Sequence, residues 1–373
     1  MKKKLAKRLI SVAMSVLMLA SLAACGEEES KSSVATSKSQ SSGAQSSGVQ
    51  SSATDEGTDP LVQTEPLLVY LNDFDDVIVD MFKEATGYDV EVVSGNGAET
   101  MSRIAAEKSN PQWDVVWIDS MYDIYSLSTD GQLLVDWEPE NAANLTDFAK
   151  ELVPDNKCMY PTGAHAAGLI VYRTDVYTEE TAPKTFAELT DAKYAGQVGM
   201  ADPGVAAPAY PLAAFFMDSL GMDGGKEFFN TLFKQQLKVY PKNPQVVNAL
   251  ASGEISVAIL QESNAYDMVA SGEPIAIVWP EDTGAPASTR VAAISAGSDQ
   301  IEIAKIFVNF LLEAETQQKL VNTGDEGFFE PSVQGVTAKA ERAANAPLAV
   351  ADIIFGSENE ADIKAWFADM SAQ

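Results

Sequence analysis

Short apolar runs alternate with amphipathic stretches in the first half of the chain. The runs at 67–71, 90–93 and 114–118 have the length and aliphatic content of buried strands. Between them, apolar residues recur at helical spacing over 77–85, and a further helix is expected over about 99–108. Strands that alternate with helices in this way predict a parallel sheet covered by helices.

The same alternation returns in the second half. Apolar runs at 197–201, 256–260 and 275–278 are each followed by polar residues, so each is expected to be a strand. The helices expected around these strands lie near 208–220, 226–234, 244–252 and 264–271. The pattern predicts a second lobe, and each lobe has the usual size of a domain. The predicted fold class is therefore α/β with two lobes.

The N-terminal stretch has the pattern of an export signal. Basic residues precede an apolar run over 9–20, which is too short for a comfortable membrane span. The run ends in Leu-Ala-Ala-Cys, which resembles the bacterial lipobox, where the cysteine is acylated and becomes the first residue of the mature protein. We expect a signal peptide over 1–24, a lipid on Cys25 and a flexible serine-rich tether over 25–63. The alternative is a plain secretion signal in which Cys25 is incidental.

Charge and composition narrow the possible functions. The 373 residues include 54 acidic and 25 basic side chains, and a net charge of −29 disfavours binding of nucleic acid or direct contact with anionic lipid. The only histidine, His165, excludes a His-rich zinc site, and the G-x-S-x-G, H-E-x-x-H and P-loop motifs are absent from the sequence. We therefore expect a protein that is not an enzyme and has no cofactor or metal. Cys158 is expected to be a buried structural cysteine.

Polar residues follow several expected strands, where ligands of open parallel sheets bind. The first-lobe candidates are Asn72, Asp73, Asn96, Gly97, Asp119 and Ser120, the second-lobe candidates are Asp202, Glu262 and Glu281, and His165 lies near the expected passage between lobes. The turn at 95–97 suits an anion because it places backbone N–H groups at a helix start. Simpler roles stay open, since most first-lobe candidates are common at helix starts and the histidine can be a packed side chain.

Three segments carry a resemblance to a known family. The segment from Asn96 to Trp117 is similar to the "G-E-x-x-x-R-I-x-A-E-K-x-N-P-Q-A-D-V" segment of the ferric-ion, phosphonate and sugar-phosphate binding proteins. Residues 278–284 resemble their "Y-P-E-D-G-T" turn, and residues 304–312 resemble the helix that follows it. Together with the lipobox and the tether, these segments make the chain resemble a bacterial substrate-binding lipoprotein of an ABC importer.

The resemblance implies a type II periplasmic-binding fold, with a ligand cleft between two lobes that each contain a mainly parallel sheet. Lobe I would comprise 64–165 plus 286–335, and lobe II would comprise 166–285 plus 336–373. The lobes would hinge shut on a solute. The closed monomer would then dock on an ABC permease at the outer face of the cell membrane, where only the lipid on Cys25 would attach it.

The expected solute follows from departures from the family pattern. Ferric-ion binders carry adjacent tyrosines where this chain has Gln-Glu-Ser-Asn at 261–264, and phosphate-ester binders carry a hydroxyl-rich loop where this chain has Asp-Pro-Gly-Val at 202–205. We therefore expect a small polar solute with a cationic or hydroxylated end, such as a zwitterion, that faces the second-lobe acids. A ferric-ion, organophosphate or phosphonate ligand is the alternative within the family. A lipid-anchored hydrolase or a surface adhesin is the alternative outside it.

Overall fold

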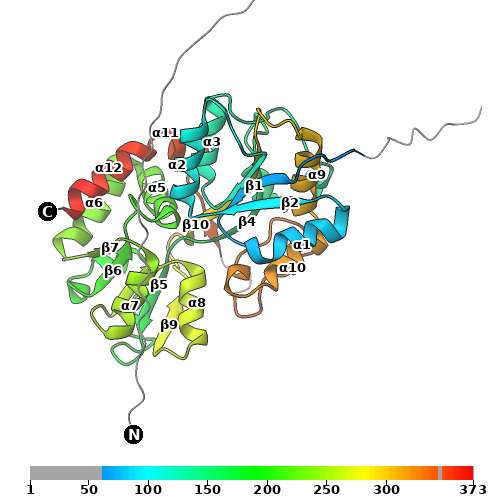
Figure 1. Ribbon diagram of the computed structural model, residues 1–373. Coiled ribbons are helices and arrows are strands. Elements are labelled where there is room, and N and C mark those ends of the chain that lie inside the picture. The colour runs from blue at the N-terminus through cyan, green and yellow to red at the C-terminus, as the bar shows by residue number, and fades with distance from the viewer. Residues whose placement is uncertain (1–60, 343–346, 373) are drawn as a thin grey trace, which may run out of the picture. The chain divides into compact units, whose positions relative to one another are not determined.

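Two β-sheets, each flanked by helices, make up the part of the chain that the structure describes (Figure 1). The computed structural model describes residues 61–342 and 347–372. The expected signal peptide, Cys25 and nearly all of the expected tether lie outside these described residues. None of the helices in the described ranges is long and apolar enough to cross a membrane.

The first sheet has the strand order β11-β10-β3-β1-β2, and β4 also pairs with β10. Its strands are β1 (Leu67–Leu71), β2 (Val90–Ser94), β3 (Val115–Ile118), β4 (Tyr160–Ala166), β10 (Ala285–Ile294) and β11 (Leu348–Ala349). Strand β1 runs parallel to β2 and β3, as the sequence predicts, whereas β10 runs antiparallel to β3 and β4.

The second sheet has the strand order β7-β6-β8-β5-β9. Its strands are β5 (Leu169–Arg173), β6 (Val198–Ala201), β7 (Lys238–Tyr240), β8 (Val257–Leu260) and β9 (Ile275–Val278). Strand β6 is parallel to β7 and β8, whereas β5 is antiparallel to β8 and β9. Both sheets are therefore mixed rather than mainly parallel.

The apolar pattern misses β10 because that strand is buried without being strongly apolar. Its sequence, Ala-Pro-Ala-Ser-Thr-Arg-Val-Ala-Ala-Ile, is buried at every position although it includes polar side chains. Strand β4 is also buried throughout and contains Gly163, where an added Cβ would lie 2.5 Å from the ring of Phe329. Small residues are thus placed where neighbouring layers approach closely, and periodicity does not reveal them.

Helices cover both sheets, and Figure 1 shows α1, α9 and α10 close to β1 and β2, with α6, α7 and α8 around the second sheet. The α-helices are α1 (Asp75–Thr86), α2 (Gly97–Glu107), α3 (Met121–Thr129), α4 (Asp147–Glu151), α5 (Tyr210–Ser219), α6 (Gly221–Lys234), α7 (Asn243–Ser252), α8 (Glu262–Ala270), α9 (Ile301–Leu311), α10 (Ala314–Val321), α11 (Ile353–Glu358) and α12 (Glu360–Ser371). Short 3₁₀ helices are η1 (Glu140–Asn144), η2 (Ala187–Thr190), η3 (Ala192–Tyr194), η4 (Ala207–Ala209) and η5 (Asp325–Gly327).

The chain passes between the sheets from β4 to β5 and again from β9 to β10. The expected lobe boundaries, 165/166 and 285/286, lie at the last residue of β4 and the first residue of β10, and the lobes and hinge positions stay a prediction. One detail differs from the expectation, because β11 lies in the segment 336–373 yet pairs with β10 of the first sheet. Helix α11 then contacts both α3 and α5, so the C-terminal segment joins the two halves.

Aromatic side chains fill the interior on both sides. Phe82 of α1 meets Phe307 of α9 with ring centres 5.0 Å apart, and Phe229 of α6 meets Phe367 of α12 at 4.7 Å. Such pairs add about 0.5–1.5 kcal/mol each beyond their buried area. Cys158 is buried, as the sequence predicts, and burial raises the pKa of its thiol. A reactive role for this thiol is therefore disfavoured.

Candidate functional site

A polar cavity of about 300 Å³ lies between the two sheets. Strands β1, β3 and β8 end at this cavity, and helices α2, α7 and α8 begin at it, which is where α/β sheets bind ligands. Its lining residues are Asn72, Asp73, Asn96, Gly97, Asp119, Val205, Ala206, Ala207, Pro208, Lys242, Asn243, Pro244, Gln261, Ser263 and Asn264.

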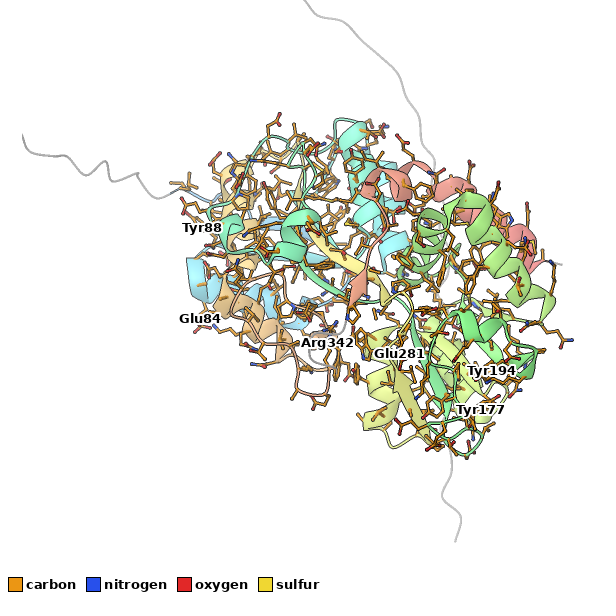
Figure 2. All side chains as sticks on the ribbon, turned by 180° about the vertical axis from the view of Figure 1, so that it is seen from behind. Glu84, Tyr88, Tyr177, Tyr194, Glu281 and Arg342 are labelled. Atoms are coloured by element: carbon orange, nitrogen blue, oxygen red, sulfur yellow. The ribbon has the colours of Figure 1, made fainter. Side chains whose placement is uncertain are left out.

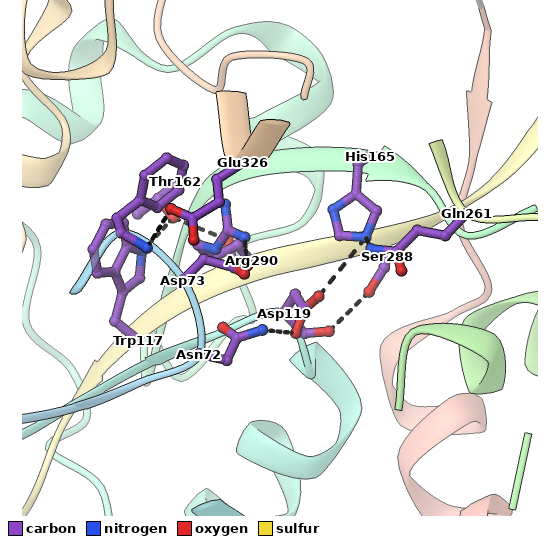
Figure 3. A network of polar contacts seen from close by, with 11 residues as sticks. Asn72, Asp73, Trp117, Asp119, Thr162, His165, Gln261, Ser288, Arg290 and Glu326 are labelled. Carbon is purple, nitrogen blue, oxygen red and sulfur yellow. Dashed lines mark hydrogen bonds and ion pairs between the residues drawn. The ribbon is translucent and has the colours of Figure 1, made fainter. Parts of the chain in front are cut away.

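Asp119, directly after β3, brings a buried carboxylate to this cavity. Only 3% of the residue is exposed, Asn72 Nδ2 donates to its Oδ1 at 2.5 Å, and His165 Nε2 lies 3.7 Å from its Oδ2 (Figure 3). Burial is the main cause that raises the pKa of Asp119 above its usual range. Among the described residues, no lysine or arginine forms an ion pair with Asp119. A buried carboxylate of this kind favours a ligand that brings a cationic donor.

Asp73 differs from Asp119 because it has a cation in direct contact. Arg290 of β10 forms an ion pair with Asp73, although only 4% of Arg290 is exposed. The guanidinium carbon lies 4.8 Å from the ring centre of Phe74, which stacks on Trp117 at 5.6 Å. Burial raises the pKa of Asp73, and the charge of Arg290 opposes this rise. The pair therefore holds Asp73 at the cavity edge with its charge already compensated.

The turn from β1 into α1 depends on an unusual backbone conformation at Phe74. Its φ angle of 67° is left-handed, a region that a non-glycine residue occupies at a cost of about 1–2 kcal/mol. The N–H of Phe74 donates to Glu326 Oε2 at 2.7 Å, and the buried ring packs against Trp117. These contacts hold the conformation that places Asn72 and Asp73 in the cavity wall.

His165 connects the two sheets through Gln261. Its Nε2 lies 3.1 Å from Gln261 Nε2 (Figure 3). Gln261 Oε1 in turn accepts a hydrogen bond from Asn243 Nδ2 at 2.8 Å. Because the Gln261 amide donates, His165 Nε2 is the acceptor, which requires a neutral ring. Burial first, and the charge of Arg290 second, lower the pKa of His165 to about 4.

This pKa predicts a pH dependence of stability. The unfolded chain protonates its histidine at pH about 6.5 and the folded chain at about 4, so the contribution of His165 is complete above pH 6.5 and is lost as the pH falls through 4. The shift corresponds to about 3 kcal/mol. We expect the wild type to lose up to about this much stability, relative to His165→Gln, between pH 7 and pH 4. Urea unfolding of both proteins across this range measures the difference, and parallel pH profiles would contradict the expectation.

The second-sheet side of the cavity is formed by helix starts. Helices α7 and α8 begin there without a hydrogen bond from a side-chain cap. The first N–H groups of a helix have no partner within it and carry partial positive charge. Lys242, the residue before α7, adds a full positive charge at the same edge. This side of the cavity therefore suits an anionic group.

Helix α2 approaches the cavity from the first sheet. Its start has a complete capping box, in which Asn96 Oδ1 accepts from the N–H of Glu99 at 3.0 Å. Gly97 lies close to both sides of the cavity, because an added Cβ would lie 2.9 Å from Ser120 Oγ and 3.2 Å from Ala207 Cβ. The glycine therefore lets α2 and the segment before α5 meet across the cavity.

The structure brings half of the sequence candidates together. Asn72, Asp73, Asn96, Gly97 and Asp119 line the cavity. Ser120 and His165 are buried beside it, the first against Gly97 and the second against Gln261. Neither of these two lines the cavity itself.

The three second-lobe acids lie elsewhere. The Asp202 carboxylate accepts a hydrogen bond from the N–H of Gly204 at 2.8 Å, and Glu281 is exposed. Glu262 is fully buried in an ion pair with Arg342. The charge arrangement is thus the reverse of the expected one, because the acids of the cavity come from the first sheet and the anion-binding groups come from the second.

Three residues of the site were not among the sequence candidates: Lys242 and Asn243, which line the cavity, and Arg290, which pairs with Asp73. Lys242 and Asn243 precede Pro244. Proline is common in the first turn of a helix, so the sequence did contain a signal for the start of α7 at this position. No sequence pattern indicated a role for Arg290, because it lies in strand β10, which the sequence analysis did not predict.

Comparison with known proteins identifies the family. The model of the bacterial extracellular solute-binding proteins matches residues 77–350. The chain belongs to this family. Membership confirms the expected solute-binding function and supports a binding protein rather than an enzyme.

Relatives and solved structures agree with this assignment. A protein of Salmonella paratyphi A named as a 2-aminoethylphosphonate-binding periplasmic protein is 26% identical over 254 residues, which cover 67% of this chain and 72% of that protein. The major ferric iron-binding protein of Neisseria meningitidis serogroup B is 25% identical over 272 residues, covering 69% and 77%.

Two solved structures resemble this family member in fold. Iron-bound HitA from Pseudomonas aeruginosa has a TM-score of 0.71 at 19% identity, covering 82% of this chain and 99% of its own. The periplasmic binding protein AfuA from Actinobacillus pleuropneumoniae, with fructose-6-phosphate bound, has a TM-score of 0.72 at 18% identity, covering 83% and 99%. These likenesses confirm the expected two-lobed type II periplasmic-binding fold.

Proposed function

We propose that this chain captures a small zwitterionic solute, with an ammonium group and a phosphonate-like anion, and delivers it to an ABC importer. The cavity has the size and position of a small-molecule site, and its two sides have opposite electrostatic character. A solute that contacts both sides stabilises the closed arrangement and so drives hinge closure. The closed monomer then docks on the permease.

The buried carboxylate of Asp119 carries the proposal. It accepts a hydrogen bond from Asn72 and lies near His165, whose lowered pKa keeps the imidazole neutral at physiological pH. A ligand ammonium supplies the missing charge and donates to the carboxylate oxygens. Asp73 is already paired with Arg290, so it serves as a secondary polar contact.

The anionic end of the solute meets the second-sheet side. The uncapped start of α8 offers backbone N–H groups, and Lys242 offers an ammonium. The start of α7 adds the N–H of Asn243, since Pro244 has no N–H and that of Gln245 donates to a backbone carbonyl. Phosphonate, phosphate and carboxylate groups all suit such a position. The relative from Salmonella paratyphi A is named for 2-aminoethylphosphonate, a molecule that has both charges in a small volume.

Ferric ion fits this cavity poorly. Among the described residues, the lining includes no tyrosine, cysteine or histidine, and Asp73 and Asp119 are its only carboxylates. Within the described ranges, no group of three or more His, Cys, Asp or Glu side chains is placed to hold a metal ion. A hard trivalent ion needs more anionic oxygen ligands than this lining provides.

The first experiment identifies a retained solute. Native mass spectrometry of the freshly purified full-length chain is expected to reveal a small bound molecule that contains an amine and an acidic group. If the protein is empty, incubation with 2-aminoethylphosphonate should add one ligand mass. Retained iron or a retained amine-free sugar phosphate would contradict the proposal, as would the absence of any adduct after incubation.

The N-terminus supports a lipid-anchored location outside the cytoplasm. The lipobox-like end of the export signal makes Cys25 the site of acylation, and the tether keeps the binding unit close to the membrane. Expression of Cys25→Ser should move the protein from the detergent phase to the aqueous phase in a phase-partition assay. Unchanged partitioning, without incorporation of labelled palmitate by the wild type, would contradict the anchor.

A further inference from the structure

A segment behind the cavity joins the two sheets. We call residues Asp325–Arg342 the latch. Its first-sheet attachments include paired backbone hydrogen bonds between Ala164 and Glu330, at 2.6 and 3.0 Å, and the bond from the Phe74 N–H to Glu326. The latch is therefore fixed to the first sheet at β4 and at the turn that carries Asp73.

The other attachments of the latch go to the second sheet. Phe328 stacks on Tyr266 of α8 with ring centres 4.6 Å apart and planes 7° from parallel. Arg342 Nε donates to Glu262 Oε1 at 2.7 Å, and its guanidinium carbon lies 4.9 Å from the ring centre of Trp279. In Figure 2, Arg342 lies between the part of the molecule that contains Glu84 and the part that contains Tyr194.

The contacted residues of α8 share one face of that helix. Glu262 and Tyr266 are four positions apart and both face the latch, while Ser263 and Asn264 of the same helix line the cavity. Glu262 also accepts a hydrogen bond from the N–H of Ala166, at the end of β4. The start of α8 is thus held from behind by the latch and is free to contact solute in front.

We infer that the latch sets the affinity for solute without touching it, by holding α8 and the β1–α1 turn in the arrangement that forms the cavity. The apparent dissociation constant of a binding protein rises as the fraction of competent molecules falls. Each latch contact therefore increases affinity by increasing that fraction. This inference rests on the proposed function for its affinity measurement, but its conformational measurement needs no solute.

Tyr266→Leu tests the latch by removing the ring that stacks on Phe328. We expect the dissociation constant for 2-aminoethylphosphonate to rise about three- to tenfold, the range that loss of one aromatic stacking contact produces. Tyr266→Phe retains the ring and loses the 3.4 Å hydrogen bond from Trp279 Nε1, so its affinity should stay close to that of the wild type. Val269→Ala, at an exposed position of α8, is the matched control and should change nothing. Thermal unfolding of each variant checks that its fold is intact.

A distance measurement on the full-length chain without solute separates the latch from a purely structural effect. Spin labels at Asp80→Cys on α1 and Asn248→Cys on α7, both exposed positions, report the separation of the two sheets by double electron–electron resonance. We expect a longer and broader distance distribution in Tyr266→Leu than in the wild type or Tyr266→Phe, and added 2-aminoethylphosphonate should restore the wild-type distance. Identical distributions in solute-free wild type and Tyr266→Leu would overturn the inference. Failure of the wild type to bind 2-aminoethylphosphonate would instead contradict the proposed function.

Discussion

Arg342→Met should lower the free energy of unfolding by about 3–5 kcal/mol, because it removes the cation from a fully buried ion pair. The side chains of Arg342 and Glu262 are 1% and 0% exposed. Burial raises the pKa of Glu262 to about 7 even though the charge of Arg342 opposes the rise. Without Arg342, an ionised Glu262 has lost its main counterion. Guanidinium unfolding at pH 8 measures the loss.

The sign of the pH effect distinguishes this explanation from a general loss of packing. Because the charge of Arg342 lowers the pKa of Glu262, its removal raises that pKa further, above about 7. At pH 5 the carboxyl is protonated and uncharged with or without Arg342, so the penalty of Arg342→Met should be smaller there than at pH 8. The double variant Glu262→Gln/Arg342→Met should recover most of the lost stability, since no buried charge remains. Lys83→Met, in the exposed pair with Asp89, is the matched control and should cost at most about 1 kcal/mol. An equal penalty at pH 5 and pH 8 would contradict the proposed cause.

Asp119→Asn should weaken binding of 2-aminoethylphosphonate by about 30-fold or more, which corresponds to the 2–5 kcal/mol cost of removing one partner of a buried charge pair. The substitution keeps the shape of the side chain and its ability to accept from Asn72, but it removes the charge that faces the ammonium. Burial already raises the pKa of Asp119, so the neutral amide should be tolerated in the fold. Calorimetric titration of both proteins gives the ratio of affinities.

Asp202→Asn is the matched control for this variant. Asp202 follows β6, as Asp119 follows β3, but its carboxylate accepts from the Gly204 N–H and does not line the cavity. The control should bind like the wild type. Equal losses in the two variants, or no loss in Asp119→Asn, would remove Asp119 from the ammonium site.

The sequence predicted most of the strongly apolar strands, although it missed β5, whose Leu-Ile-Val-Tyr run is buried. The apolar runs that become β1, β2, β3, β6, β8 and β9 are recognisable because most of their side chains are apolar, and β3, β6 and β8 are buried at every position. Strands β4 and β10 were missed because they consist largely of small and polar residues. Neighbouring layers pack closely against these strands, and this close packing favours small side chains. Strand β10 runs antiparallel to β3 and β4, and β5 runs antiparallel to β8 and β9, so both sheets are mixed.

The candidate site was predictable on the first-sheet side only. Asn72, Asp73 and Asp119 directly follow apolar runs, so the rule for strand ends located them. The same rule also selected Glu262, which follows β8 but occupies the first turn of α8 on the face opposite the cavity. Its partner Arg342 is 80 positions away along the chain, and no local pattern reveals that pairing.

The most direct test of the account is a pair of calorimetric titrations of the wild-type full-length chain. One uses 2-aminoethylphosphonate and the other uses ethylphosphonate, which has the same anion but lacks the amine. If Asp119 receives an ammonium while the starts of α7 and α8 receive the anion, 2-aminoethylphosphonate should bind at least about 30-fold more tightly. Equal affinities for the two ligands, or no binding of 2-aminoethylphosphonate, would contradict the account.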